Sequence, residues 1–338
     1  MRSREISIAF QTNKSSAEYI SLARRTNQYG FDVVSVYCDL PYQPSFGPLF
    51  IMAPHIKESR IGPAAVSPSR MHPLDIAANA ALLSPLAEGG IYIGLARGAW
   101  LYDYGIKESP KPIQGIREAT YLIRKTLSGY IPEFHGEVFQ ISRGRKAPYP
   151  TPSKETPLLI GTWGQRLSEV AGEIADEVKV GGSANPEFAK YIKERINLGE
   201  DKAERNKNSV NLVVGAVTVV DEDRERARML AKEALVLYLP VVAALDKTLT
   251  IPIDLIDRIR NEYETGQLKT AAKLIPDDLL DKFAFAGTPT DLINQSEALF
   301  DAGVKRVEFG TPHGINPHNG IDLIGRKVLP YLSNHWKK

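Results

Sequence analysis

The sequence predicts an α/β protein folded as a single (β/α)₈ TIM barrel, and three observations carry this prediction. Eight short apolar runs alternate with helical patterns along the 338 residues. The runs are nearly continuous, as expected for parallel strands that are buried on both faces. No clear linker divides them, and barrels of this kind reach such lengths as one unit. An open doubly wound sheet is the alternative arrangement of the same units.

The predicted elements follow in order along the chain. Apolar runs rich in β-branched residues predict strands at residues 6–10, 32–37, 61–66, 91–95, 158–161, 177–180, 212–220 and 306–309. Apolar residues at helical spacing predict helices at residues 16–29, 74–87, 113–127, 165–175, 186–196, 224–239, 290–302 and 320–331. Gly30 stands where a helix C-cap is expected, and Pro73 suits the first turn of a helix.

Two stretches, residues 128–156 and 240–285, interrupt this rhythm. The first is rich in Gly and Pro and holds a hairpin-like run at residues 137–141, and the second is mostly helical. In barrels, long insertions of this kind often build the active-site face. We therefore expect one barrel over residues 1–338, with insertions at 128–156 and 240–285.

Composition narrows the classes of partner. The net charge is +2, from 42 basic and 40 acidic residues, which argues against a nucleic-acid partner. Cys38 is the only cysteine, so an internal disulfide and a multi-cysteine metal site are excluded. No stretch approaches the ~20 apolar residues of a membrane span, and no leader-like segment precedes the first strand. We expect a cytoplasmic protein without a membrane partner or a metal.

Glycine-bearing motifs follow two neighbouring strands. Gly161, Thr162, Trp163 and Gly164 end one strand and open a helix, and Gly181 and Gly182 end the next. Backbone N–H groups at a helix N-terminus attract anions, and glycines leave them accessible. The two motifs together predict a shared phosphate site; each alone is also compatible with a plain turn.

Three further motifs carry polar side chains. Arg97 and Gly98 follow the fourth strand, where the arginine can bind a phosphate or a ring carbonyl; the alternative is a surface arginine on a turn. Asp39 follows the second strand and is a site candidate or a cap of the next loop. His313 lies after the eighth strand, either as a hydrogen-bonding residue at the pocket mouth or as a structural residue of a rigid loop.

Read in order, these motifs resemble the bacterial luciferase-like superfamily. The resemblance runs end to end and is strongest in the branch that uses the deazaflavin coenzyme F420, near the methylenetetrahydromethanopterin reductases. Its most specific stretches are residues 61–73 (IGPAAVSPSRMHP), 93–100 (IGLARGAW), 175–180 (ADEVKV), 286–289 (AGTP), 301–304 (DAGV), 310–312 (GTP) and 321–325 (IDLIG).

The resemblance implies a role for each matching position. Asp39 matches an acid near the hydroxyl end of the cofactor ring, and Ala64 and Ala65 match a bulge with a non-prolyl cis peptide behind the ring. Arg97 and Gly98 match ring contacts, so Asp39 and Arg97 would tune its electronics. The implied phosphate cradle comprises Gly161, Thr162, Trp163, Gly164, Gly181 and Gly182. A homodimer or higher homo-oligomer is also implied.

The sequence departs from the family at three positions that handle protons in relatives. Leu40 replaces a frequent His, and Ala9 and Ala99 stand where the reductases carry acids. The leading hypothesis is hydride transfer between F420 and a small organic substrate, with a methylenetetrahydromethanopterin-type pterin as one candidate. The second is an FMN-dependent monooxygenase on the same fold. The third, motivated by the missing acids, is a barrel that has lost its activity.

Overall fold

Eight parallel strands form a closed barrel in the computed structural model, which describes residues 4–334. In chain order they are β1 (Glu5–Phe10), β2 (Val33–Val36), β3 (Arg60–Pro63), β4 (Ile93–Ala96), β9 (Leu158–Gly161), β10 (Glu177–Gly181), β11 (Asn211–Val220) and β13 (Arg306–Gly314). They pair in the order β3-β2-β1-β13-β11-β10-β9-β4, and parallel bridges at Ile61–Ile91 and Val66–Leu95 join the two ends. The predicted (β/α)₈ barrel is confirmed, and the open sheet is excluded.

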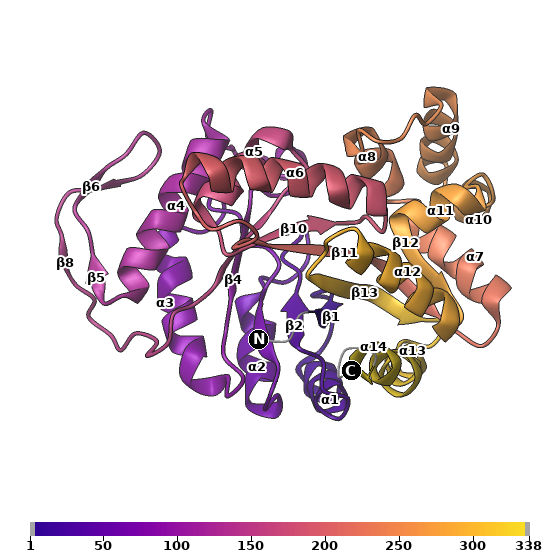
Figure 1. The fold of residues 1–338 in the computed structure, drawn as a ribbon, viewed down its shortest axis with the longest axis horizontal. Coiled ribbons are helices and arrows are strands. Elements are labelled where there is room, and N and C mark those ends of the chain that lie inside the picture. The colour runs from indigo at the N-terminus through magenta and orange to yellow at the C-terminus, as the bar shows by residue number, and fades with distance from the viewer. Residues whose placement is uncertain (1–3, 335–338) are drawn as a thin grey trace.

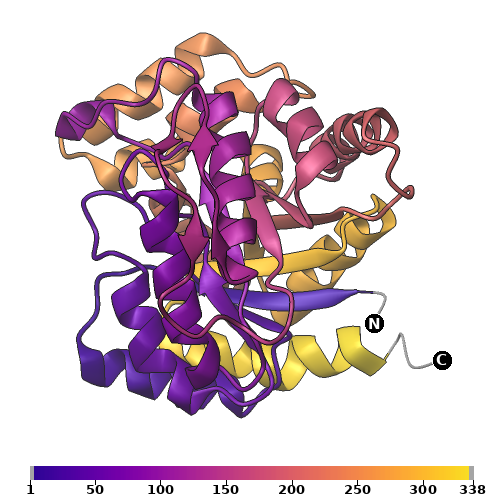
Figure 2. The ribbon, with the colours of Figure 1, turned by 90° about the vertical axis from the view of Figure 1, so that its left-hand side faces the viewer.

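Helices surround the strands, as Figure 2 shows. They are α1 (Ser16–Asn27), α3 (Pro73–Leu83), α4 (Pro112–Leu127), α5 (Gln165–Ile174), α6 (Pro186–Lys202), α7 (Arg224–Leu235), α12 (Pro289–Asp301), α13 (Pro317–Leu323) and α14 (Leu329–Asn334). Local sequence fixes their starts: Ser15 and Glu18 form a capping box at α1, and Thr288 and Asp291 form another at α12.

Three features of the fold differ from the sequence prediction. A short helix, α2 (Phe46–Met52), follows β2 and was not predicted, since its second and third residues are a Gly and a Pro. A further strand, β12 (Ala284–Gly287), pairs with Val217–Val220 of β11. The final predicted helix is interrupted by a π-helical turn, Ile324–Val328, between α13 and α14.

The two interrupting stretches lie at opposite ends of the long axis in Figure 1. The first contains two short antiparallel pairs, β5 (Tyr130–Ile131) with β8 (Arg145–Lys146) and β6 (Phe134–His135) with β7 (Gln140–Ile141). The second is mostly helical and contains α8 (Leu239–Val242), α9 (Ile253–Glu264), α10 (Leu268–Lys273) and α11 (Asp277–Phe283). Along the chain, α8–α11 come between β11 and β12, so they are positioned by the seventh barrel strand.

Apolar side chains form two separate large clusters. The larger lies between the barrel strands and the surrounding helices and includes Ile8, Val180 and Phe309. The smaller lies among α7–α11, β12 and the end of β11, and includes Val219 and Phe283. The α8–α11 segment therefore packs mainly on a core of its own.

The amino-terminal end of the barrel is closed by charged side chains. Arg306 is almost fully buried, and its guanidinium donates to both carboxylate oxygens of Glu177 at 2.8 and 2.7 Å. Arg60 binds Glu177 at 3.1 Å and Glu5 at 3.0 Å. The neighbouring arginines hold the pKa of the Glu177 carboxyl below its usual range, against the effect of burial. This buried network fills the end of the barrel opposite the carboxyl ends of the strands.

Candidate active site

Small residues lie side by side at the carboxyl ends of neighbouring strands. A Cβ placed on Gly161 would lie 3.4 Å from the Cβ of Ala96 and 3.8 Å from the Cβ of Ala65. Gly181 ends the adjacent strand β10 and is exposed. We call Ala65, Ala96, Gly161 and Gly181 the mouth floor. Because no large side chain rises from these positions, the backbone offers a surface on which a planar ring can lie.

The peptide bond between Ala64 and Ala65 is cis. The family resemblance predicted a non-prolyl cis peptide at this position, and the structure confirms it. Backbone bonds fix the bulge on both sides: the Ala64 N–H donates to Val36 at 2.8 Å, and the Val66 N–H donates to Gly94 at 2.8 Å. The bulge therefore borders the mouth floor on the side of β3.

Asp39 lies at the end of β2 within a polar cluster. The Gln11 side-chain amide donates to its carboxylate at 3.2 Å, and the Arg70 guanidinium donates to the neighbouring Cys38 carbonyl at 2.7 Å. Burial raises the pKa of Asp39, while the Gln11 bond and the charges of Lys179 and Arg70 oppose that rise. The sequence identified Asp39 but missed Gln11 and Arg70, which follow the first and third strands.

Aromatic rings from two segments meet near Asp39. Trp100, in the loop after β4, lies with its ring centroid 6.1 Å from that of Tyr238, just beyond α7. Burial, followed by the charge of Asp39, raises the pKa of Tyr238 to about 12. The pair links the loop after β4 to the start of the helical insertion. Neither aromatic residue was predicted as part of the site.

Arg97 is half exposed and already has an anionic partner. Its Nε and one terminal nitrogen each donate to Glu108 at 2.7 Å, a bidentate pair. The Ser67 hydroxyl donates to the Arg97 carbonyl, and Gly98 turns the chain with a φ of 105°. The sequence placed Arg97 at the site, but Glu108 was missed. The pairing leaves Arg97 with less free charge than the sequence suggested.

A pocket of about 240 Å³ opens beside Arg97. Two cations and an apolar wall line it: Pro68, Ser69, Arg97, Lys107, Glu108, Ser109, Pro112, Gly115, Ile116, Val138 and Phe139. Glu118 fixes one side, because its carboxylate accepts from the N–H groups of Glu137, Val138 and Phe139 at 2.7, 3.0 and 2.9 Å. The pocket therefore combines an apolar wall with the cation Lys107 and the Arg97–Glu108 pair.

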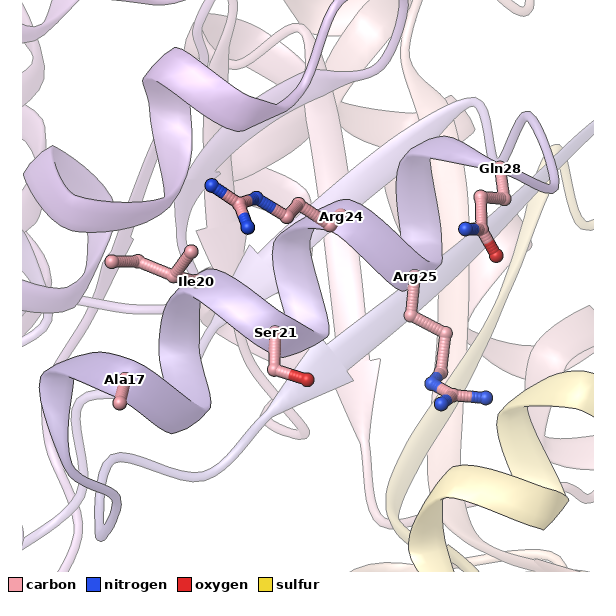
Figure 3. Close-up of a pocket in the computed structure, with 6 residues that line it drawn as sticks. All are labelled: Ala17, Ile20, Ser21, Arg24, Arg25 and Gln28. Carbon is pink, nitrogen blue, oxygen red and sulfur yellow. The ribbon is translucent and has the colours of Figure 1, made fainter.

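A second hollow, of about 530 Å³, lies elsewhere on the molecule (Figure 3). Its lining residues Ala17, Ile20, Ser21, Arg24, Arg25 and Gln28 all belong to α1 or its C-cap. Arg25 is bound to Asp322 at 2.6 Å, which ties α1 to α13. No strand end contributes to this hollow, so its larger volume does not make it a candidate site in a barrel.

The predicted phosphate cradle is brought together, but its N–H groups are not all free. Trp163 donates from its indole to the Gly181 carbonyl at 2.8 Å, which joins the two glycine motifs. The Gly182 N–H donates to Gly215 at 2.6 Å, and the Gly164 N–H donates to the Thr162 hydroxyl at 2.9 Å. Helix α5 has no side-chain cap after Gly164. The N–H groups of the first turn of α5, which follows Gly164 of the cradle, can therefore bind an anion.

His313 is buried inside the wall of the barrel. The residue is 1% exposed, and its Nε2 donates to the Ala9 carbonyl at 3.1 Å. The ring also lies 5.2 Å from that of Phe10. This placement favours the structural role over a role at the pocket mouth, and the residue has a positive φ of 76°.

Replacing His313 with asparagine, which tolerates a positive φ, is expected to remove part of the protein's acid sensitivity. Burial and the charge of Lys14 lower the pKa of His313 from 6.5 to about 3. Between these values the unfolded chain binds a proton that the folded chain does not. The stability present above pH 6.5 is therefore lost as the pH falls toward 3.

Urea unfolding at pH 7 and pH 5 measures this effect. The stability difference between the two pH values should be smaller in His313→Asn than in the wild type. His135→Asn, at an exposed histidine, serves as the control and should leave the difference unchanged. An equal pH dependence in His313→Asn and the wild type would contradict the assignment.

Residues 4–334 contain no helix long and apolar enough to cross a membrane. Over the same residues, no group of three or more His, Cys, Asp or Glu side chains is placed to bind a metal ion.

The closed barrel, with small residues at its carboxyl end, defines a (β/α)₈ protein whose candidate site is the barrel mouth. The chain belongs to the luciferase-like monooxygenase family, whose model matches residues 5–306.

Several named proteins are similar to this chain in sequence or in structure. The 5,10-methylenetetrahydromethanopterin reductase of Archaeoglobus fulgidus is 28% identical over 324 residues, covering 93% of this chain and 94% of its own length. An F420-dependent glucose-6-phosphate dehydrogenase of Nakamurella multipartita is 24% identical over 332 residues, covering 94% and 92%. The structure of the coenzyme F420-dependent tetrahydromethanopterin reductase of Methanopyrus kandleri superposes with a TM-score of 0.87 at 22% identity, covering 97% and 99%. This likeness supports the fold.

Proposed function

We propose that the protein is an oxidoreductase that transfers a hydride between coenzyme F420 and a small organic substrate at the barrel mouth. The observation that carries this proposal is the mouth floor, where small residues of neighbouring strands lie side by side. The named relatives support it, because the Nakamurella dehydrogenase and the Methanopyrus reductase are both named for their dependence on F420. A deazaflavin, when bound, supplies the carbon centre that gives or accepts the hydride.

The residues of the mouth fit such a group. Gly161 and Gly181 leave room for a planar ring, and the uncapped first turn of α5 can bind a phosphate. Asp39 follows β2 and its donor Gln11 follows β1, where they can hydrogen-bond a ring or substrate. The protein's part is to hold two reactants in contact and to exclude water, with Trp100 and Tyr238 near the polar cluster.

A pterin-type compound is the substrate class we propose first. The Archaeoglobus relative is named for such a substrate. The pocket beside Arg97 combines apolar walls from Ile116 and Phe139 with the cation Lys107 and the Arg97–Glu108 pair. These features suit the non-reacting part of a bicyclic substrate that carries an acidic group. A sugar phosphate, the substrate class in the name of the Nakamurella relative, is the comparison to test beside it.

An FMN-dependent monooxygenase is the second candidate, and the description of the matching family favours it. Flavin and deazaflavin share a planar tricyclic ring, so the mouth floor alone does not distinguish them. A monooxygenase would consume oxygen with reduced FMN, whereas an F420 enzyme would not.

Titration of the purified protein with F420 and, separately, with FMN tests the proposal. We expect F420 to bind with a change in its absorbance or fluorescence, and FMN to bind more weakly. Tighter binding of FMN with oxygen consumption would favour the monooxygenase. Binding of neither cofactor would contradict both proposals and favour a barrel without activity.

A homodimer and a cytoplasmic location stay predictions from the sequence and its family resemblance. Size-exclusion chromatography with light scattering tests the first. For the second, subcellular fractionation of the source organism is the measurement.

A further inference from the structure

The barrel interior contains a second buried ion pair, close to the mouth. Lys179 on β10 and Glu308 on β13 are in contact through Nζ and Oε1, and their side chains are 7% and 0% exposed. Burying two charges is costly unless the pair is well held by further hydrogen bonds. The burial of this ion pair therefore needs an explanation other than packing.

Hydroxyl groups hold the glutamate in place. The Ser35 hydroxyl donates to Oε2 of Glu308 at 2.5 Å, and the Ser7 hydroxyl lies 3.4 Å from the same oxygen. Tyr92 donates in turn to Ser35 at 2.7 Å. With one oxygen on Lys179 and the other on hydroxyls, the Glu308 carboxylate has the partners that an ionised group needs.

The lysine reaches from this anchor toward Asp39. Its Nζ lies 5.0 Å from the ring centroid of Tyr37, which precedes Asp39 by two residues at the same strand end. A Cβ on Gly181, part of the mouth floor, would lie 3.9 Å from Cε of Lys179. The lysine stem thus lies beside Gly181 of the mouth floor, between Glu308 and the ring of Tyr37.

Several charged or titratable groups surround Asp39. Lys179 comes from β10, Arg70 from the loop after β3, Tyr37 from the end of β2 and Tyr238 from the segment after α7. Burial raises the pKa of Asp39, and the Gln11 hydrogen bond, then the charge of Lys179 and then that of Arg70 oppose this rise. Burial, followed by the charges of Glu308 and Asp39, raises the pKa of Tyr37.

The pair at the opposite end of the barrel differs in its surroundings. Glu177 binds Arg60 as well as Arg306, and Arg306 also lies 3.4 Å from Glu5. In barrels, the amino-terminal face serves stability and the carboxyl-terminal face serves chemistry. The two pairs fit these two tasks.

We propose that Lys179, anchored by Glu308, is a positioning residue that keeps Asp39 a carboxylate at the barrel mouth. This places the charge control of the site on three strands, β2, β10 and β13, and offers one answer to the absence of acids at Ala9 and Ala99. The role of Asp39 toward a ligand rests on the proposed function. Its charge state does not, and can be measured in the protein alone.

The test is a pH titration of Asp39 by NMR in protein labelled with ¹³C at the aspartate carboxyls, with the signal assigned by Asp39→Asn. In Lys179→Met, Asp39 should titrate at higher pH than in the wild type. Lys179→Arg keeps the charge and should restore the wild-type midpoint. An unchanged midpoint in Lys179→Met would overturn the proposal.

A second variant covers the case in which Lys179→Met leaves Glu308 unpaired and fails to fold. Lys179→Met/Glu308→Leu removes both buried charges, a replacement that proteins often tolerate. Because the cation that lowers the pKa of Asp39 is lost in this variant too, the midpoint of Asp39 should again lie above that of the wild type. A wild-type midpoint in this folded variant would equally overturn the proposal.

A cofactor measurement separates this inference from the proposed function. If the wild type binds F420, hydride transfer at pH 6 should fall about tenfold or more in Lys179→Met and recover in Lys179→Arg. If the wild type binds no cofactor but Asp39 titrates as expected, the proposed function fails and the role of Lys179 stands. If the cofactor binds and the Asp39 midpoint is unchanged in Lys179→Met, the proposed function stands and the proposed role of Lys179 fails.

Discussion

Replacing Gly161 with leucine is expected to abolish F420 binding while the barrel stays folded. The new Cβ would meet Ala96 and Ala65 at ordinary contact distances of 3.4 and 3.8 Å, so the first carbon fits. The rest of the side chain would extend over the mouth floor and occupy the place of a planar ring. We expect the affinity to fall at least a hundredfold, or about 2.7 kcal/mol.

Fluorescence titration of the cofactor measures this effect, with thermal unfolding as a check of the fold. Gly161→Ala adds only the tolerated carbon and should keep most of the affinity. Gly47→Leu is the matched control, since Gly47 lies in α2 and a Cβ added there would meet no atom within 4 Å. Undiminished binding by Gly161→Leu would mean that the cofactor does not lie on this floor.

Replacing Arg306 with methionine is expected to cost about 3–5 kcal/mol in the free energy of unfolding. Arg306 supplies two of the short bonds to the buried Glu177, and Arg60 alone would remain beside that carboxylate. An uncompensated charge would then be left inside the barrel. This is the largest stability effect that we expect from a single side chain of the interior.

Urea unfolding tests this expectation with two companion variants. Arg306→Met/Glu177→Leu removes both charges and should recover most of the loss. Arg260→Met removes an exposed pair with Asp257 and should change stability by less than about 1 kcal/mol. If Arg306→Met proved no more costly than Arg260→Met, the network at the amino-terminal end would have no structural role.

The strands were predictable because each is a run of apolar residues buried from both sides, as in β11. β12 was missed because its sequence, AFAG, has no β-branched residue. It forms because the end of β11 extends past β10 and needs a partner. The local sequence of β12 does not show that the end of β11 lacks a partner, because this depends on the length of β11, which lies far away in the sequence.

The candidate site also contains residues that could be predicted from the sequence and residues that could not. Asp39 and Gly161 were predicted because strand ends in a barrel meet at one mouth, and the Ala64–Ala65 bulge was predicted from the family resemblance. Gln11 and Glu108 were missed because their roles depend on a partner that folding brings near. Lys179 and Glu308 sit inside predicted strands, where a charged residue usually marks an exposed face; here both point into the barrel.

Trp163 stands where the two hydrophobic cores meet, since it packs against both clusters and stacks on Phe188 at 5.0 Å. Its indole also joins the glycine motifs at the start of α5. A single fluorophore of the native chain therefore contacts the barrel, the helical insertion and the proposed phosphate cradle. With the other two tryptophans, Trp100 and Trp336, replaced by phenylalanine, its emission can serve as an optical reporter of ligand arrival without any attached label.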